Sequence, residues 1–462
     1  MGICCCDPRW VKFTGLVLGC LGEFVTGSVF VFNLYLGAIK RTFNYTQQEV
    51  ELQSSLLYLG QGFGIIPGMF FDRFGPAWTS AVGLVLAVSS YVFLWTTSGA
   101  VLFYSIRSWL MGIYFFVAGK GVGTAFTYMV SMNTNLVNFT QQQRGKVMGT
   151  LNCFFSGSPF VYSLVYYHVF NGNDPDNLES FPRLMMLVAI SFAVVNSLCI
   201  LFLRRLPESK ERANQSISYE DINGIPNDLS KVLEKDVSMS TTCLAGNCNF
   251  HALLWVFTLT SSVGVFVTNN LTEIATSVRL DRHNPTLVLL IPVTTMVVSI
   301  LIGVLSDKYI GTFPRSSVVL IGIGSFIISQ MLFLLLADVF SLLIIATILV
   351  GIGNAIMWSL GPVLTADILY IGNLGRNWGL ITLVNAIFCF ALQEVFGVMY
   401  ENAITTPNEL FCFGLHCLRG AFGIGLTSTL LSFLPALVLF IRTKSSFPKP
   451  KPEVNGTIAI LE

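Results

Sequence analysis

The sequence predicts an all-α polytopic membrane protein, with twelve transmembrane helices in two six-helix pseudo-repeats. Three observations lead to this prediction: the apolar composition, a series of long apolar segments, and landmarks that recur in the second half of the chain. Of the 462 residues, 53% are hydrophobic and only 11% are charged, whereas a soluble domain contains about 25% charged residues. Such a chain cannot cover a water-facing surface. Its net charge of +1 also argues against a nucleic-acid partner.

The transmembrane helices are predicted from segment length, because a helix needs about 20 mostly apolar residues to cross the hydrocarbon core. Twelve segments meet this condition: 11–36, 52–71, 77–97, 108–133, 147–168, 182–203, 252–276, 285–305, 316–336, 340–365, 378–399 and 420–441. A stretch with 13 charged residues separates six spans from six, which predicts a mobile linker. The predicted domains are an N-terminal six-helix bundle at 1–203, a cytosolic linker at 204–250, a C-terminal six-helix bundle at 251–441 and a cytosolic tail at 442–462.

The distribution of lysine and arginine predicts the orientation. If both termini are cytosolic, 18 of the 26 basic residues lie in cytosolic segments, 7 lie on the opposite side and one lies within a span. Leaving out the six in the linker gives 12 against 7, which still follows the positive-inside rule. We therefore expect a multi-pass protein with cytosolic termini, in the plasma membrane or in an endosomal or vacuolar membrane.

Landmarks in the two halves recur at nearly the same offset. The stretch after the second predicted span contains Gly68, Asp72, Arg73 and Gly75, and the stretch after the eighth contains Gly303, Asp307, Lys308 and Gly311. Asp307 lies 235 residues after Asp72. Arg376, before the eleventh span, lies 232 residues after Arg144, before the fifth. Parallel repeats of this kind are a transporter architecture, with the substrate site near the membrane midplane between the halves.

The motif Gly-x-x-x-Asp-Arg/Lys in these two loops resembles the signature of the major facilitator superfamily. Stretches 27–40, 269–274 and 349–358 are similar to the nodulin-like branch, which is itself similar to monocarboxylate porters and to some amino-acid transporters of protists. The resemblance covers the chain outside 204–250 and the tails. It implies the major facilitator fold and a secondary transporter that works by alternating access. Pro76 departs from the motif, which usually has a basic residue there.

The repeated motif also has a physical interpretation. Glycine lets membrane helices approach closely, and a carboxylate can accept hydrogen bonds from the first amides of a neighbouring helix and complement its dipole. Pseudo-twofold packing predicts Asp72 near Arg376, Asn377 and Trp378. It predicts Asp307 near Arg144, Gly145 and Lys146. The predicted conformational latch comprises Gly68, Asp72, Arg73, Gly75, Gly303, Asp307, Lys308, Gly311, Arg144 and Arg376. The alternative is that these charged loops only fix the topology.

Two charged residues, Glu23 and Lys120, fall at mid-depth in the first and fourth spans. Each costs about 2.5–3.5 kcal/mol on insertion scales, so an intramembrane charge suggests function. We predict that the two side chains pair, either as a binding or proton-coupling site or as a structural ion pair of the N-terminal bundle. Burial favours the neutral form of Glu23, unless Lys120 keeps it ionised. A midplane lysine favours a carboxylate-bearing substrate, unless Glu23 neutralises it.

Uncharged polar and aromatic residues form a second set of candidates for substrate binding. Asn269 and Asn270 lie in the seventh span, and Asn354 and Trp358 lie in the tenth. Trp358 and Tyr128 are candidate aromatic walls. The alternative for each residue is helix packing, because hydrogen bonds between membrane helices are common.

Covalent modification is predicted at a few positions. Asn44 heads an exofacial glycosylation sequon. Cys4, Cys5 and Cys6, just before the first span, suit palmitoylation. Cys412 and Cys417 share the last outer loop, and the sequence leaves open whether they form a disulfide. No metal site is predicted.

These observations favour a secondary active carrier of small organic solutes, monocarboxylate- or amino-acid-like. One alternative is a non-transporting nutrient receptor on the same fold. A membrane-embedded enzyme is disfavoured, because the sequence has no histidine cluster, Walker-type loop or intramembrane aspartate pair. The expected partners are a small-molecule substrate, a coupled proton and the lipid bilayer, with no nucleic acid and no cofactor. The protein is expected to be a monomer.

Overall fold

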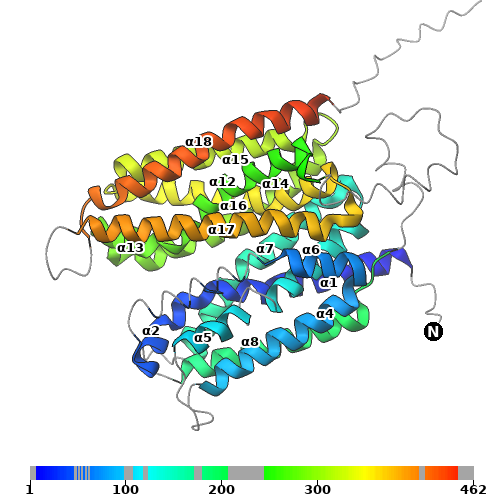
Figure 1. The fold of residues 1–462 in the computed structure, drawn as a ribbon, viewed down its shortest axis with the longest axis horizontal. Coiled ribbons are helices and arrows are strands. Elements are labelled where there is room, and N and C mark those ends of the chain that lie inside the picture. Colours follow the sequence, from blue (N-terminus) through cyan, green and yellow to red (C-terminus); the bar gives the residue numbers. More distant parts are fainter. Residues whose placement is uncertain are drawn as a thin grey trace, which may run out of the picture.

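A computed structural model of the chain shows a bundle of helices (Figure 1). It describes residues 7–45, 63–97, 108–117, 123–170, 179–206, 244–404 and 412–445, together with residues 49, 53, 56, 57 and 60. Within this part, nine helices are long and apolar enough to cross a membrane, judged by length and composition. Both ends of the described chain lie at one end of the bundle (Figure 1), which we call the termini side. The chain is thus an all-α polytopic membrane protein.

The first half, blue to teal in Figure 1, forms one bundle. Its elements are α1 (Pro8–Gly27), η1 (Ser28–Val31), α2 (Phe32–Phe43), α4 (Ile65–Trp95), α5 (Ser108–Phe115), α6 (Gly123–Asn138), α7 (Gln141–Val165), η4 (Tyr166–Phe170) and α8 (Ser180–Phe202). Its core gathers buried aromatic side chains such as Phe32, Phe115 and Phe181. Phe115 lies edge-on to Phe32, 5.3 Å away between ring centroids.

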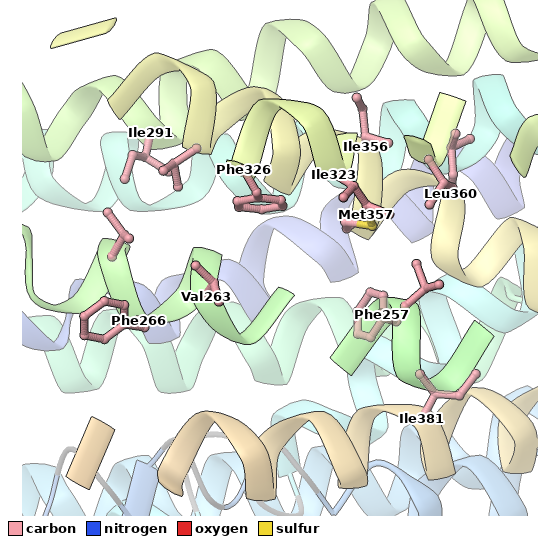
Figure 2. Close-up of a cluster of buried hydrophobic side chains, with 14 of the residues drawn as sticks. Phe257, Val263, Phe266, Ile291, Ile323, Phe326, Ile356, Met357, Leu360 and Ile381 are labelled. Carbon is pink, nitrogen blue, oxygen red and sulfur yellow. The ribbon is translucent and has the colours of Figure 1, made fainter. Parts of the chain in front are cut away.

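The second half, green to red in Figure 1, forms the other bundle. Its elements are α12 (Cys248–Asn269), α13 (Leu271–Ser277), η5 (Asp281–His283), α14 (Asn284–Lys308), α15 (Arg315–Leu336), α16 (Phe340–Ile368), η6 (Ile371–Asn373), α17 (Leu374–Asn402) and α18 (His416–Ser445). Figure 2 shows part of its core, where Phe257 from α12, Phe326 from α15 and Ile356 from α16 are buried. This core continues into α6 and α7 of the first half.

The loop predicted between the second and third spans is a sharp turn inside α4. Gly75 has φ 76° there, between two helical segments. Glycine adopts this left-handed region without the clash that a Cβ atom would cause. Pro76 follows, and proline suits the first turn of a helix because its missing N–H would have no partner there. The glycine of the motif is therefore explained by backbone conformation.

Other predicted spans differ from the observed helices. The fifth begins at Gln141, six residues before the predicted boundary, because its polar first turn is helical. Because α7 contains polar residues such as Asn152, it is not among the nine helices that are apolar enough to cross a membrane. The seventh span is interrupted: α12 ends at Asn269 and α13 begins at Leu271. The fourth is represented by α5 and α6, and residues 118–122 lie outside the described part.

The loop before α18 is tied to two other helices. Cys412 and Cys417 form a disulfide, which answers the question that the sequence leaves open. The amide of Cys412 donates to the Tyr400 hydroxyl at 3.2 Å, and that hydroxyl lies 3.1 Å from the Ser277 hydroxyl. The amide of Gly414 donates to the Ser277 carbonyl at 2.7 Å. The loop therefore joins the ends of α13 and α17 to the start of α18.

Replacing both Cys412 and Cys417 by serine is expected to lower the stability by about 2 kcal/mol, because a cross-link restricts the unfolded chain even when the closed loop is short. Thermal melting of the purified protein, with and without a dithiol reductant, measures the effect. Reductant should lower the melting temperature of the wild type and leave the double variant unchanged. A wild type insensitive to reductant, with a melting temperature equal to that of the variant, would contradict this role.

Candidate functional site

A cavity lies between the two halves. It is lined by Thr26, Val29, Phe30, Gly64, Thr124, Ala125, Tyr128, Met129 and Phe155 from the first half, and by Val265, Trp358, Thr382, Asn385, Ala386 and Cys389 from the second. It encloses about 700 Å³, including space open to solvent. A cavity with a mostly apolar lining and a few polar groups has the composition typical of a small-molecule site.

Only some of the predicted binding residues lie at this cavity. Trp358 and Tyr128, the candidate aromatic walls, are among its lining residues. Asn354 instead packs against Gly264. Asn270 donates to the Gln393 side chain at 3.1 Å and to the Phe266 carbonyl at 2.9 Å. It therefore holds the break between α12 and α13, and neither it nor Asn269 is among the lining residues.

Several lining residues were not predicted as site residues, among them the threonines Thr26 and Thr382. The hydroxyl of Thr26 donates to the Gly22 carbonyl at 2.7 Å. The hydroxyl of Thr382 donates to the Gly379 carbonyl at 3.0 Å. A threonine that bonds to its own helix has no distinguishing sequence signal, because such bonds occur throughout membrane helices. These threonines line the cavity because the two halves meet there, and that interface forms only in the folded chain.

Glu23 is buried beside this cavity. Its side chain is 1% exposed, and neither carboxyl oxygen has a hydrogen-bond partner in the described part of the chain. It lies close enough to Cys20 and Tyr128 for electrostatic interaction. Lys120, its predicted partner, lies outside the described residues. The pairing of these two residues therefore stays a prediction.

Asp72 crosses from the first half to the start of α17 in the second. Its carboxylate accepts hydrogen bonds from the amides of Gly375, at 3.0 Å, and Arg376, at 2.8 Å. These amides belong to the first turn of α17, where the helix dipole favours negative charge. The guanidinium of Arg376 turns instead toward the Asn377 side chain, 3.3 Å away. We call this contact the Asp72 clamp.

Asp307 makes the equivalent contact from the second half to the start of α7 in the first. Its carboxylate accepts hydrogen bonds from the amides of Gly145, at 2.9 Å, and Lys146, at 2.7 Å. It also forms a buried ion pair with Arg315. We call this contact the Asp307 clamp. Both clamps thus lie at the predicted helix starts. For Asp307 the two amides are among the predicted residues, whereas for Asp72 only Arg376 is, and the second amide is that of Gly375 rather than of Asn377 or Trp378.

The Asp307 clamp belongs to a larger charge network. Arg315 also pairs with Asp367 at the end of α16 and donates to the Gln141 carbonyl of the first half at 2.7 Å. Asp367 in turn pairs with Arg144 across the halves, at 2.8 Å. Arg144 therefore bonds to Asp367 rather than directly to Asp307. Sequence analysis missed Arg315 and Asp367, because a charge at a predicted helix end is ordinary unless its partner is known.

Glycines permit the close approach at both clamps. A Cβ atom on Gly68 would overlap the carbonyl of Gly375, and one on Gly303 would overlap the carbonyl of Gly145. The other motif residues lie outside these contacts. Arg73 and Lys308 stack on the rings of the residues that follow them. A Cβ atom on Gly311 would meet nothing within 4 Å.

The remaining predicted sites lie at the edges of the described part. Asn44 is exposed at the end of α2 with φ 54°, whereas Cys4, Cys5 and Cys6 lie outside the described residues. Among the described residues, Cys412, His416 and Cys417 bring three potential metal ligands within 4.8 Å of one another. The disulfide occupies both sulfurs, and metals bind the thiolate form.

A model of the nodulin-like family matches residues 9–233. Over that stretch, which is just under half of its length, the chain matches the nodulin-like family, and its fold is the major facilitator fold. None of the curated protein sequences compared with it matches.

Solved structures similar to this chain include major facilitator transporters. One is the proton:xylose symporter XylE bound to 6-bromo-6-deoxy-D-glucose, with 15% identity over 95% of this chain and 100% of that one, at a TM-score of 0.69. The transporter FucP in the outward conformation has 14% identity over 95% and 100% of the two chains, at 0.62. The human organic anion transporter TETRAN has 14% identity over 94% and 100%, at 0.60. At these identities the likeness shows the fold.

Proposed function

We propose that this protein is a secondary active carrier of small organic solutes, monocarboxylate- or amino-acid-like, that works by alternating access. The observation that carries the proposal is the arrangement of the interface: a cavity lined by both halves lies next to two clamps that join the halves on one side. A solute in the cavity is then shielded from that side while the clamps hold.

The clamps suit a reversible gate because each is made of a few polar contacts. A carboxylate at a helix N-terminus is worth about 0.3–1 kcal/mol when exposed and up to about 2 kcal/mol when partly buried. Two such contacts bias a two-state equilibrium by about tenfold or more. This bias is large enough to hold one state and small enough for a bound solute to reverse.

The closed side is the cytosolic side in this proposal. The bias of basic residues toward the termini side supports it. The disulfide between Cys412 and Cys417 supports it independently, because it lies between the end of α17 and the start of α18, at the end of the bundle away from the termini. Disulfides persist in oxidising compartments and are rare in the cytosol.

Uptake of labelled solute into proteoliposomes tests this function against the receptor alternative. A carrier fills the lumen with solute, in a saturable manner and in proportion to the lumenal volume. A non-transporting receptor binds the same solute without filling the lumen. Collapse of an imposed proton gradient should slow the uptake if a proton is coupled through Glu23.

Glu23 and Lys120 are proposed as the coupling or binding pair. Lys120→Ala is expected to impair transport, and to lower the melting temperature because it leaves Glu23 as an unpaired buried charge. Adding Glu23→Gln to that variant should restore the melting temperature without restoring transport. A double variant that is less stable than Lys120→Ala alone would contradict the pairing. Uptake and thermal melting of the same preparations provide both measurements.

A further inference from the structure

We infer that Asn152 is an internal lock of the closed state, because its amide group joins α7 of the first half to both α14 and α16 of the second. This inference rests on the proposed function and deepens it, since it places a second layer of closure between the Asp307 clamp and the cavity. The residues concerned are Asn152, Ser299 and Ser359, which we call the Asn152 lock. All three are uncharged, so the lock consists of hydrogen bonds alone.

The Asn152 side chain bonds to two helices of the opposite half. Its amide nitrogen donates to the Ser299 hydroxyl at 2.8 Å and to the Ser359 hydroxyl at 3.2 Å. Ser299 donates its own hydroxyl hydrogen to the Thr295 carbonyl at 2.6 Å, which leaves its oxygen to accept from Asn152. Asn152 is 3% exposed, and the two serines are 0% exposed. Buried polar groups need partners, so these bonds must be exchanged for others when the halves part.

The lock lies one layer further into the membrane than the Asp307 clamp. Asn152 follows Gly145 by seven residues on α7, and Ser299 precedes Asp307 by eight residues on α14. At 1.5 Å per residue, both distances place the lock about 10–12 Å from the clamp. Between the two layers, a Cβ atom on Gly149 would lie 2.4 Å from the Ser299 carbonyl. The two helices are therefore in backbone contact from the clamp to the lock.

On its other side the lock adjoins the cavity. Phe155 lies three residues after Asn152 on α7, and Trp358 directly precedes Ser359 on α16. Both aromatic residues line the cavity. A solute that displaces either ring therefore moves one of the helices that the lock joins. Opening then exposes an amide and two hydroxyls to water, which can hydrate them, whereas an apolar seam would resist such exposure.

Alanine substitution and distance measurement test the lock. Asn152→Ala is expected to raise the ratio of open to closed molecules about fivefold, because it removes two bonds between membrane helices and leaves the Ser359 hydroxyl without this donor. Spin labels at Gln142 and Thr312, which are exposed at the start of α7 and just beyond the end of α14, report the separation. They are attached to unnatural amino acids, so the native cysteines stay unchanged. The measurement is made in the wild type and in Asp72→Asn, whose weakened clamp populates both states.

Asn196→Ala is the matched control. Asn196 is also a buried asparagine, and it donates to the Thr127 hydroxyl at 3.1 Å, but this bond joins α8 to α6 within the first half. The control should lower the melting temperature and leave the distance distribution unchanged. Ser359→Ala is the second test variant, because it removes one acceptor of the lock without leaving a buried hydroxyl. Its expected rise in the open-to-closed ratio is about twofold, and it serves as the test if Asn152→Ala does not fold.

The outcomes separate the lock from the carrier function, because the labels report without any solute. Unchanged distributions in the folded lock variants, or an equal shift in Asn196→Ala, would overturn the lock. Lumenal uptake by the wild type together with unchanged distributions would overturn the lock and leave the carrier function standing. A shift confined to the lock variants, in a protein that fills the lumen with no solute, would support the lock and overturn the carrier function.

Discussion

Replacing Gly68 by valine is expected to reduce transport at least tenfold. Gly68 lies where α4 meets α17, and a side chain there would overlap the carbonyl of Gly375. Backbone atoms cannot move aside as a flexible side chain can, so the halves could not close on the termini side. The two glycines lie on different halves, so the fold of each bundle should persist. A tenfold population change corresponds to about 1.4 kcal/mol, which a steric overlap of this kind exceeds.

Gly324→Val provides the control for this substitution. Gly324 also lies in a membrane helix, α15, but a Cβ atom there would meet nothing within 4 Å. Proteoliposome uptake should fall for Gly68→Val and stay near the wild-type rate for Gly324→Val. Reactivity of a cysteine placed at the termini side should rise only in the first variant, because that side stays open. A Gly68→Val protein that transports normally would show that α4 and α17 need not meet.

The second large effect is a difference between the two clamps. Asp307→Asn is expected to open the termini side far more than Asp72→Asn. Asp307 accepts from two amides of the first half and also holds Arg315, whose guanidinium donates to the Gln141 carbonyl of the first half. Loss of Asp307 therefore disturbs three hydrogen bonds across the halves, whereas the hydrogen bonds of Asp72 across the halves are those from two amides, worth at most about 2 kcal/mol. The charge network therefore makes the two halves of the gate unequal.

Paired spin labels across the termini side measure this difference. The distance distribution should shift toward the open state strongly in Asp307→Asn and weakly in Asp72→Asn. Lys308→Gln serves as the control, because Lys308 follows Asp307 in sequence but stacks on Tyr309 instead of joining the clamp. Equal shifts in the two aspartate variants would show that the Arg315 network does not strengthen closure.

The fold was predictable from the sequence because its signals are local or repeated. Apolar segment lengths predict the helices, and the recurrence of Asp72 as Asp307 predicts the relation between the halves. Helix-dipole chemistry was enough to place each aspartate at a helix start. The break at Asn270 was not predicted, because a polar residue in an apolar segment gives no sign of the backbone angles.

The cavity was less predictable, because its residues are defined by contacts between distant segments. Trp358 was expected from its place in the tenth span, but Thr382 and Phe155 look like ordinary helix residues. The partners of Arg315 are separated from it by 8 and 52 residues, and only the packing of α14, α15 and α16 brings them together. Asn354, predicted as a binding residue, packs against Gly264, a contact that could not be foreseen from the sequence.

Alternating access is tested by the amount of labelled lactate that collects inside proteoliposomes carrying the wild type or Gly68→Val. The wild type should accumulate lactate in the lumen in a saturable manner. Gly68→Val should bind lactate without accumulating it, because its halves cannot close on the termini side. Binding without accumulation by the wild type as well would contradict alternating access, and would make the protein a receptor on a transporter fold.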